Sequence, residues 1–348
     1  MINSLTLAPK FYTHLLGHSK CIAPDNVKQE IEKIFENFDQ SAPIDNKENI
    51  RDCGAWVVKN SRAQFGVFTT ADTHLYRVRK ALKVKKYISE NHYDNEIAVP
   101  DKYIYFNPKD EQLYAVCKKL NLSNEIAGIE SPAWESYLKE GYSRSGQVQA
   151  LRDGKPKRNL TFTQAKASAE LSFLGYTDFN YTNLYFTQDG KLAILDTEPF
   201  NRALKKTLCS GLKGYFFDKV ALHAQQAIEG IARLKHYCTD PKAMQVVKQI
   251  ERNNALWNIA KLVTKITLIA LVGVSIIALM SKISLIGAVA LITLVSLKEI
   301  VLFYQLNNLC LAWYHSSKGN LNKLNRLDDT ALFICSFYDE IISLLSFR

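Results

Sequence analysis

The sequence has few glycines and prolines and no recognisable cysteine pattern. Its 348 residues include 15 Gly and 9 Pro, which excludes a collagen-like chain. Hydrophobic residues at 47% and charged residues at 22% exclude a disordered one. The seven cysteines are scattered, with no CxxC and no Cys/His ligand spacing, so we expect neither a zinc site nor a disulfide framework. The first twenty residues lack a basic start followed by a long apolar stretch, and we therefore expect no cleaved secretory signal.

Motifs of several common function classes are also missing. The seven histidines show no HExxH and no paired metal-ligand spacing, and no serine lies in a GxSxG elbow. A formal net charge of +10 favours anionic partners such as nucleotide phosphates, nucleic acid or acidic lipid. Because no helix-turn-helix, zinc-finger or RNP motif accompanies this charge, we expect no nucleic-acid binding.

Two uncharged apolar runs lie late in the chain, at Ile266–Ser281 and Ile283–Leu297, with Lys282 between them. As a helix, the first run would cover about 24 Å of a hydrocarbon core about 30 Å thick, so flanking residues must contribute if it crosses a membrane. Lysines flank the pair on both sides, which predicts a two-helix membrane hairpin with both termini on the cytosolic side. The alternative is a buried helical hairpin of a soluble domain. The hairpin is similar to that of the inclusion-membrane proteins secreted by some intracellular bacteria.

The region between Trp56 and Lys119 predicts an α+β arrangement. Short runs with strand-like composition surround one helix, in the order β-β-β-α-β-β. The expected strands contain Trp56–Val58, Phe65–Phe68, Leu75–Val78, Tyr103–Phe106 and Leu113–Val116, and the helix is Ala81–Asn91.

Helices are expected on both sides of this region. A helix over Asn26–Phe35 precedes it, and helices dominate from Ser131 to about Asn254. Thr161 and Gln164 form a capping-box pattern for a helix that Gly175 closes. The expected division is a helical and linker segment (1–50), a folded domain (51–255), the hydrophobic hairpin (256–304) and a helical tail (305–348).

Three polar residues lie around a predicted β-hairpin. Asn183–Thr187 and Lys191–Leu195 flank a Gln-Asp-Gly turn, which is a strong hairpin signal. Asp178 comes before the first strand, Asn183 opens it, and Asp196 follows the second strand. An acid, an amide and a second acid at one rim are the groups that metal-assisted phosphoryl transfer uses. Capping of strands and turns is the purely structural alternative.

The spacing of Asp178, Asn183 and Asp196 resembles the catalytic and metal-binding loops of the protein-kinase-like fold. The segment GYTDFNYTNLYF…GKLAILDTEP looks closest to its small-molecule kinases, such as aminoglycoside and choline kinases. The resemblance implies a bilobed domain over 51–255 that binds Mg²⁺ and ATP. It implies that Asp178 orients the attacking hydroxyl, and that Asn183 and Asp196 bind the metal.

The same resemblance extends to the small lobe and the hinge. It implies that Lys80, with Arg79 as second choice, pairs with the nucleotide phosphates from the third strand. Glu90 would be the ion-pair partner of this lysine, and Cys117–Lys119 would lie near the hinge.

The chain departs from the family at several points. Only Gly66 is present where a glycine-rich loop is expected, and Tyr176-Thr177 stands in place of the usual histidine-containing pair. The sequence therefore predicts a membrane-anchored, Mg-ATP-dependent phosphotransferase acting on an unidentified hydroxyl. The alternative is a non-catalytic pseudokinase or membrane scaffold, of the kind bacteria secrete as effectors, with membrane lipid and a protein as its partners.

Overall fold

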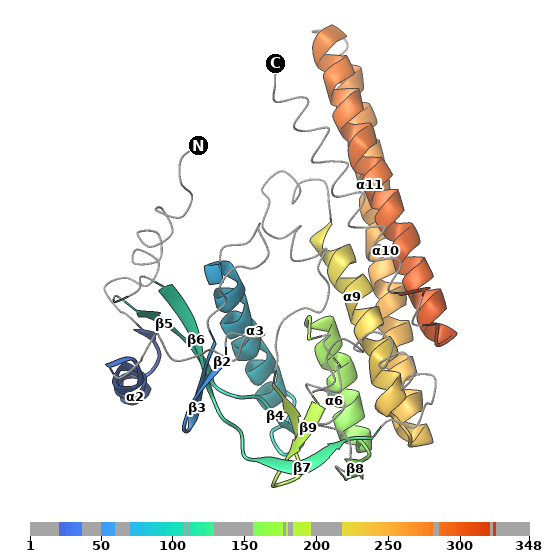
Figure 1. Ribbon diagram of the computed structural model, residues 1–348. Helices are drawn as coiled ribbons and strands as arrows, with labels where there is room; N and C mark the ends of the chain where they lie inside the picture. The colour runs from blue at the N-terminus through green and yellow to red at the C-terminus, as the bar shows by residue number, and fades with distance from the viewer. Residues whose placement is uncertain are drawn as a thin grey trace. The chain divides into compact units, whose positions relative to one another are not determined.

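The computed structural model describes residues 21–36, 50–59, 70–107, 109, 112–128, 156–176, 179, 184–195, 218–280, 285–320 and 323–324. These residues form a mixed α+β fold, as expected, with six α-helices and two five-stranded sheets (Figure 1). The chain divides into two compact units. The first includes the described residues up to Glu125 together with residues 184–195, and the second includes those from Ile126 to Phe179 and from Asp218 onward.

An antiparallel sheet with the strand order β1-β5-β6-β3-β2 organises the first unit. Its strands are β1 (Cys21–Ile22), β2 (Ile50–Cys53), β3 (Trp56–Lys59), β5 (Lys102–Asn107) and β6 (Gln112–Lys118). The strands expected around Trp56, Tyr103 and Leu113 are confirmed, whereas the one expected at 65–68 lies outside the described residues. Gly54 has a φ of 73° in the turn between β2 and β3, a conformation that favours glycine.

Two helices cover this sheet. They are α2 (Asp25–Glu36) and α3 (Thr70–Glu90), which lie on either side of its strands (Figure 1). Helix α2 confirms the helix expected over Asn26–Phe35, and its buried Ile31 and Phe35 pack on one sheet face. The ring of Phe35 stacks on that of Tyr105 with centroids 4.1 Å apart. Because side chains alternate along a strand, Ile104 and Ala115 face the opposite side, where α3 packs.

Helix α3 corrects the sequence-based prediction for residues 75–80. Tyr76, Val78 and Lys80 alternate as in a strand, but all of them lie inside α3. Buried apolar residues recur along α3 every three or four positions, which is the period of a helix rather than a strand. These residues are Val78, Ala81, Val84 and Ile88. The helix expected from Ala81 therefore begins about three turns earlier.

The second sheet has the strand order β4-β10-β9-β7-β8. Its strands are β4 (Ile97–Ala98), β7 (Leu122–Ala127), β8 (Lys157–Arg158), β9 (Leu184–Thr187) and β10 (Leu192–Ile194). Strands β9 and β10 form the expected antiparallel hairpin, with Leu184 opposite Ile194. Gly190 adopts a φ of 82° in its turn, and the Thr187 amide donates to the Lys191 carbonyl at 2.9 Å.

Helices dominate the second unit. They are α6 (Phe162–Phe173), α9 (Lys219–Leu234), the short 3-10 helix η1 (Lys235–Tyr237), α10 (Pro241–Met280) and α11 (Leu285–Ser317). The capping box of Thr161 and Gln164 is confirmed, and Gly175 follows the helix end with a φ of 92°. Pro241 opens α10, and the Asp240 side chain accepts a hydrogen bond from the Ala243 amide at 2.9 Å.

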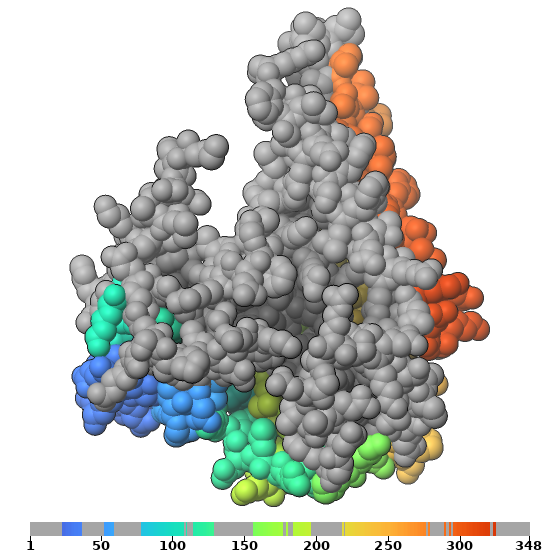
Figure 2. Space-filling model, viewed as in Figure 1, coloured from blue at the N-terminus to red at the C-terminus, as the bar shows by residue number. Residues whose placement is uncertain are grey.

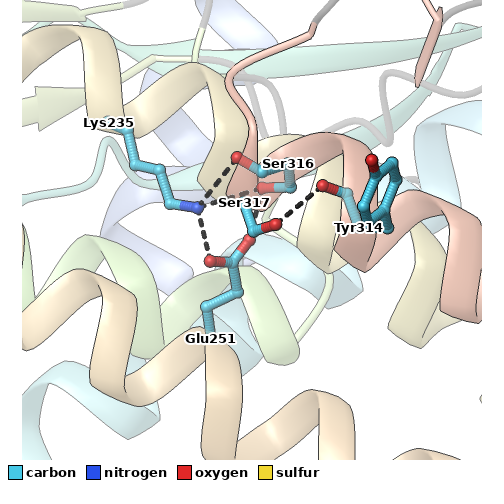
Figure 3. Close-up of polar contacts among 5 residues, drawn as sticks. All are labelled: Lys235, Glu251, Tyr314, Ser316 and Ser317. Atoms are coloured by element: carbon cyan, nitrogen blue, oxygen red, sulfur yellow. Dashed lines mark hydrogen bonds and ion pairs between the residues drawn. The ribbon is translucent and has the colours of Figure 1, made fainter.

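A buried ion pair joins three helical elements of this unit (Figure 3). Lys235 of η1 pairs with Glu251 of α10, and the Ser316 hydroxyl of α11 donates to the other carboxylate oxygen. The lysine also donates to the Ser316 hydroxyl oxygen at 3.1 Å. Because the side chain of Glu251 is 3% exposed, both charges depend on this arrangement for compensation.

Helices α10 and α11 contain the apolar runs and pack against each other. Gly273 lies so close to Val295 that an added Cβ would come within 2.8 Å of the valine Cγ1. Among the described residues, one helical stretch, Pro241–Ser275, is long and apolar enough to cross a membrane, and an 18-residue segment of it has a mean hydropathy of 1.6. Only 17% of that segment is buried, whereas the core helix of a soluble protein is mostly buried. Part of the α11 surface can be followed in orange in Figure 2.

Candidate functional site

The three residues predicted to carry the chemistry, Asp178, Asn183 and Asp196, lie outside the described residues. The structure describes the chain on both sides of each of them. These flanking residues show which elements hold the candidate loops, one in each unit.

In the second unit, the two described residues nearest to position 178 are buried aromatic residues. Tyr176 and Phe179 are both fully buried, and their rings meet edge to face with centroids 4.9 Å apart. The hydroxyl of Tyr237, in η1, donates to the Phe179 carbonyl at 3.4 Å. The catalytic-loop candidate is therefore flanked by residues that belong to the core of the helical unit.

In the first unit, the β9–β10 hairpin supports the other two candidates. Leu184 follows Asn183 directly and is opposite Ile194, two residues before Asp196. Both side chains are fully buried. The first strand therefore begins, and the second strand ends, at the same end of the hairpin. The sequence predicts this arrangement of the two strands.

A buried lysine, not anticipated from the sequence, contacts the chain beside Asp196. Lys102 of β5 is 5% exposed, and its ammonium donates to the carbonyl of Leu195 at 2.8 Å. Lys102 occupies an inward position of the β5 alternation, on the same face as Ile104 and Phe106. The sequence did contain a signal for this burial, because Lys102 occupies a strand position that alternates in step with apolar residues.

Lys80 is the second buried lysine of the first unit, at 8% exposure. It lies on α3 rather than on a strand, so the prediction that Lys80 acts from the third strand of the small lobe is wrong. Burial, together with the nearby charge of Lys83, lowers the pKa of Lys80 to about 8. A buried cation of this kind favours an anionic neighbour.

Glu90 does not form the expected ion pair with Lys80. Both residues lie on α3, ten positions and thus about 15 Å apart along the helix axis. The Glu90 side chain is exposed, and its Oε1 atom lies 3.6 Å from the Nζ atom of Lys86, one helical turn earlier. The salt bridge between a strand lysine and a helix glutamate is therefore not made by this pair.

The residues that the structure describes include no group of three or more His, Cys, Asp or Glu side chains that could hold a metal ion. Both predicted metal ligands, Asn183 and Asp196, lie outside the described residues. No protein-family model, curated protein or solved structure matches the chain.

Proposed function

We propose that the protein is a membrane-anchored, kinase-like phosphotransferase that uses Mg²⁺ and ATP to phosphorylate a hydroxyl group. The contact between Lys102 and the Leu195 carbonyl carries this proposal. It joins the lysine-bearing face of the first sheet to the residue next to Asp196. Phosphoryl transfer needs such a pairing, with cations near the phosphates and a carboxylate beside them for the metal.

The order of the elements supports the same reading. Strands β2 and β3 are followed by α3 and then by β5 and β6 in one antiparallel sheet, which resembles a kinase small lobe. Helix α6 precedes position 178, and the β9–β10 hairpin separates Asn183 from Asp196. The boundary between the units, at Glu125, follows the expected hinge at Cys117–Lys119.

In this proposal Asp178 orients the attacking hydroxyl, while Asn183 and Asp196 bind Mg²⁺. We assign the phosphate-pairing role to Lys59 instead of Lys80. Lys59 ends β3 in the sequence Trp-Val-Val-Lys and is in register with Ala115 of β6. Protein kinases place this lysine on a strand of the small lobe, which Lys59 satisfies and Lys80 does not. Lys102 is the positioning residue that holds the segment leading to Asp196.

Nucleotide binding tests the proposal directly. The full-length protein in detergent is melted with and without millimolar Mg·ATP, and we expect the melting temperature to rise because the ligand binds only the folded state. Asp196→Asn should remove the rise. Asp189→Asn is the matched control, because Asp189 lies in the turn of the same hairpin and pairs with Lys191. A wild-type protein that shows no rise would contradict the kinase proposal.

A non-catalytic membrane scaffold is the second candidate. The observation that favours it is the large exposed apolar surface of α10 and α11, which needs no nucleotide to serve as an anchor. Membrane attachment without a nucleotide-dependent rise would select this candidate. The expected membrane form is the same in both cases, a two-helix hairpin with both termini on the cytosolic side.

A further inference from the structure

The short helix η1 contacts both the chain beside position 178 and the long helices of the second unit. Its last residue, Tyr237, donates from its hydroxyl to the carbonyl of Phe179, the residue after Asp178, at 3.4 Å. Its first residue, Lys235, pairs with Glu251 of α10. One turn of backbone therefore connects the candidate catalytic loop to α10.

The contact at the Tyr237 end of η1 lies inside the core. Tyr237, Phe179 and Tyr176 are all fully buried. A buried carbonyl that loses its donor cannot bond to water instead, so the tyrosine hydroxyl matters more here than it would at the surface. On the other side of position 178, the Tyr176 amide donates to the carbonyl of Leu171 in α6 at 3.1 Å. The described chain is thus held on both sides of Asp178.

The contacts at the Lys235 end fix η1 on α10 and α11 (Figure 3). The Lys235 ammonium donates to the hydroxyl oxygen and the carbonyl of Ser316 at 3.1 and 3.4 Å, in addition to its pairing with Glu251. The Ser316 hydroxyl donates to the other carboxylate oxygen. Because these charges need each other inside the unit, the arrangement fixes where η1 begins. Tyr237 is two residues further on, so a shift of η1 against the long helices would also move the donor to Phe179.

We propose that Tyr237 is a positioning residue for Asp178, and that Lys235 sets the position of Tyr237 by fixing η1 on α10 and α11. A residue that orients an attacking hydroxyl must be held to within about 0.5 Å, and supporting hydrogen bonds to its surroundings supply that precision. Tyr237 supplies one of them to the backbone next to Asp178. This inference rests on the proposed phosphotransferase function and adds the residues that hold its catalytic loop.

Hydrogen exchange tests the positioning without any need for activity. The full-length protein in detergent is diluted into heavy water, and peptides that contain residues 174–182 are followed by mass spectrometry. Tyr237→Phe keeps the ring and removes the hydroxyl, so we expect these amides to exchange about tenfold faster, the effect of one hydrogen bond to a buried carbonyl. Peptides from the start of α10 should exchange as in the wild type, which separates a local effect from general unfolding. Equal exchange of residues 174–182 in the two proteins would overturn the inference.

Two serine variants test the role of Lys235. Ser316→Ala removes the hydroxyl that contacts both Lys235 and Glu251 but keeps both charges, and it should also speed the exchange of residues 174–182. Ser317→Ala is the matched control, because the Ser317 hydroxyl donates to the Tyr314 carbonyl at 2.7 Å on an exposed part of α11. Equal exchange of residues 174–182 in the two serine variants would show that Lys235 does not set the position of Tyr237.

The rate of ATP hydrolysis connects the positioning to the proposed function. Without an acceptor, water attacks the γ-phosphorus and ADP leaves, and the released phosphate is measured. For Tyr237→Phe we expect a kcat about tenfold lower and an unchanged KM for Mg·ATP, because Asp178 orients the attacking group whereas Asn183 and Asp196 bind the metal. A changed KM with the wild-type kcat would contradict a role in positioning Asp178. A wild type without hydrolysis or nucleotide binding would contradict the phosphotransferase, and hydrogen exchange would still decide whether Tyr237 holds the loop.

Discussion

At the scale of single residues, one buried lysine of the first sheet contacts the backbone next to the candidate site residue Asp196. Lys102 is an inward residue of β5, yet it reaches the Leu195 carbonyl, 93 positions away in the sequence. This hydrogen bond holds the backbone of Leu195, the residue that precedes Asp196. The effect of removing it can be separated from a general loss of stability, because Lys109 makes contacts of the same type elsewhere.

We expect Lys102→Met to weaken the Mg·ATP-dependent rise in melting temperature as well as the fold. The substitution leaves the Leu195 carbonyl without this donor, at a cost of about 1–3 kcal/mol in unfolding free energy. Lys109→Met is the control, because Lys109 donates to the carbonyls of Phe35 and Glu36 at the end of α2. The control should keep the nucleotide-dependent rise. If both variants keep it, Lys102 has no role in positioning Asp196.

Asp218 should make stability depend on acidity. Burial acts to raise the pKa of its carboxyl, but the ion pair with Lys265 and the hydrogen bonds from Ala221 and Val220 lower it below the ordinary value of 3.8. A carboxyl with a depressed folded-state pKa stabilises the fold above its unfolded-state value and loses that contribution as pH falls through the folded-state value. Melting temperatures measured between neutral pH and about pH 2 should therefore fall less steeply for Asp218→Asn than for the wild type.

At the level of elements, one buried ion pair connects three helical elements of the second unit. Glu251 serves both Lys235 and Ser316, so it holds α10 to η1 and to α11 at once (Figure 3). Helices α10 and α11 also lie close together at Gly273, where an added Cβ would meet Val295. Each of these contacts can be broken separately.

Glu251→Gln should lower the unfolding free energy by about 3–5 kcal/mol, because it leaves the buried Lys235 without its counter-ion. Burial already lowers the pKa of that lysine against the opposing effect of Glu251. Thermal melting followed by circular dichroism measures the change. Arg252→Gln, at the adjacent exposed position of α10, should melt close to the wild type. Equal melting temperatures for the two variants would contradict a structural role for the ion pair.

Gly273→Leu should separate α10 from α11, since any side chain at this position meets Val295. We expect a melting temperature in detergent several degrees below that of the wild type. Ser275→Leu makes a similar change on an exposed position of the same helix and should be tolerated. A Gly273→Leu variant as stable as Ser275→Leu would show that the close approach is unimportant.

At the scale of the whole molecule, the main question is whether the apolar part of α10 crosses a membrane, as its length and composition would allow. Helix α10 packs against α6, α9 and α11, and Glu251 and Lys265 of this helix form ion pairs with Lys235 and Asp218. After Lys265, the side chains of Leu268, Leu271, Val272 and Val274 are exposed. A single helix therefore combines packing within the second unit with an exposed apolar stretch, as the proposed membrane anchor requires.

Alkaline carbonate extraction should leave the wild-type protein in the membrane pellet. A variant lacking residues 266–297 should move to the supernatant while it keeps the contacts of Lys235, Glu251 and Ser316, which lie outside the deletion. Its circular dichroism spectrum checks that the remaining helices fold. Release of the wild type into the supernatant would contradict the anchor.

Elements with strong local signals could be predicted from the sequence. Each of these signals acts within a few residues. A capping box marks the helix after Thr161, and a proline in the first turn marks the start of α10. A glycine with positive φ marks the turn of the β9–β10 hairpin. Residues 75–80 could not be assigned correctly, because four residues of alternation do not distinguish a strand from the end of a longer amphipathic helix. The burial of Val84 and Ile88 extends the helical pattern back through Val78.

The sequence by itself determined the α+β class, most element positions, the two apolar runs and the spacing of Asp178, Asn183 and Asp196, because these depend on local periodicity and residue type. Only the tertiary structure decided that Lys102 meets Leu195, that Lys80 and Glu90 lie on one helix, and that Asp218 binds Lys265 at the base of the apolar helices. Such contacts join residues tens of positions apart, and they arise from the packing of whole elements, which no local pattern records.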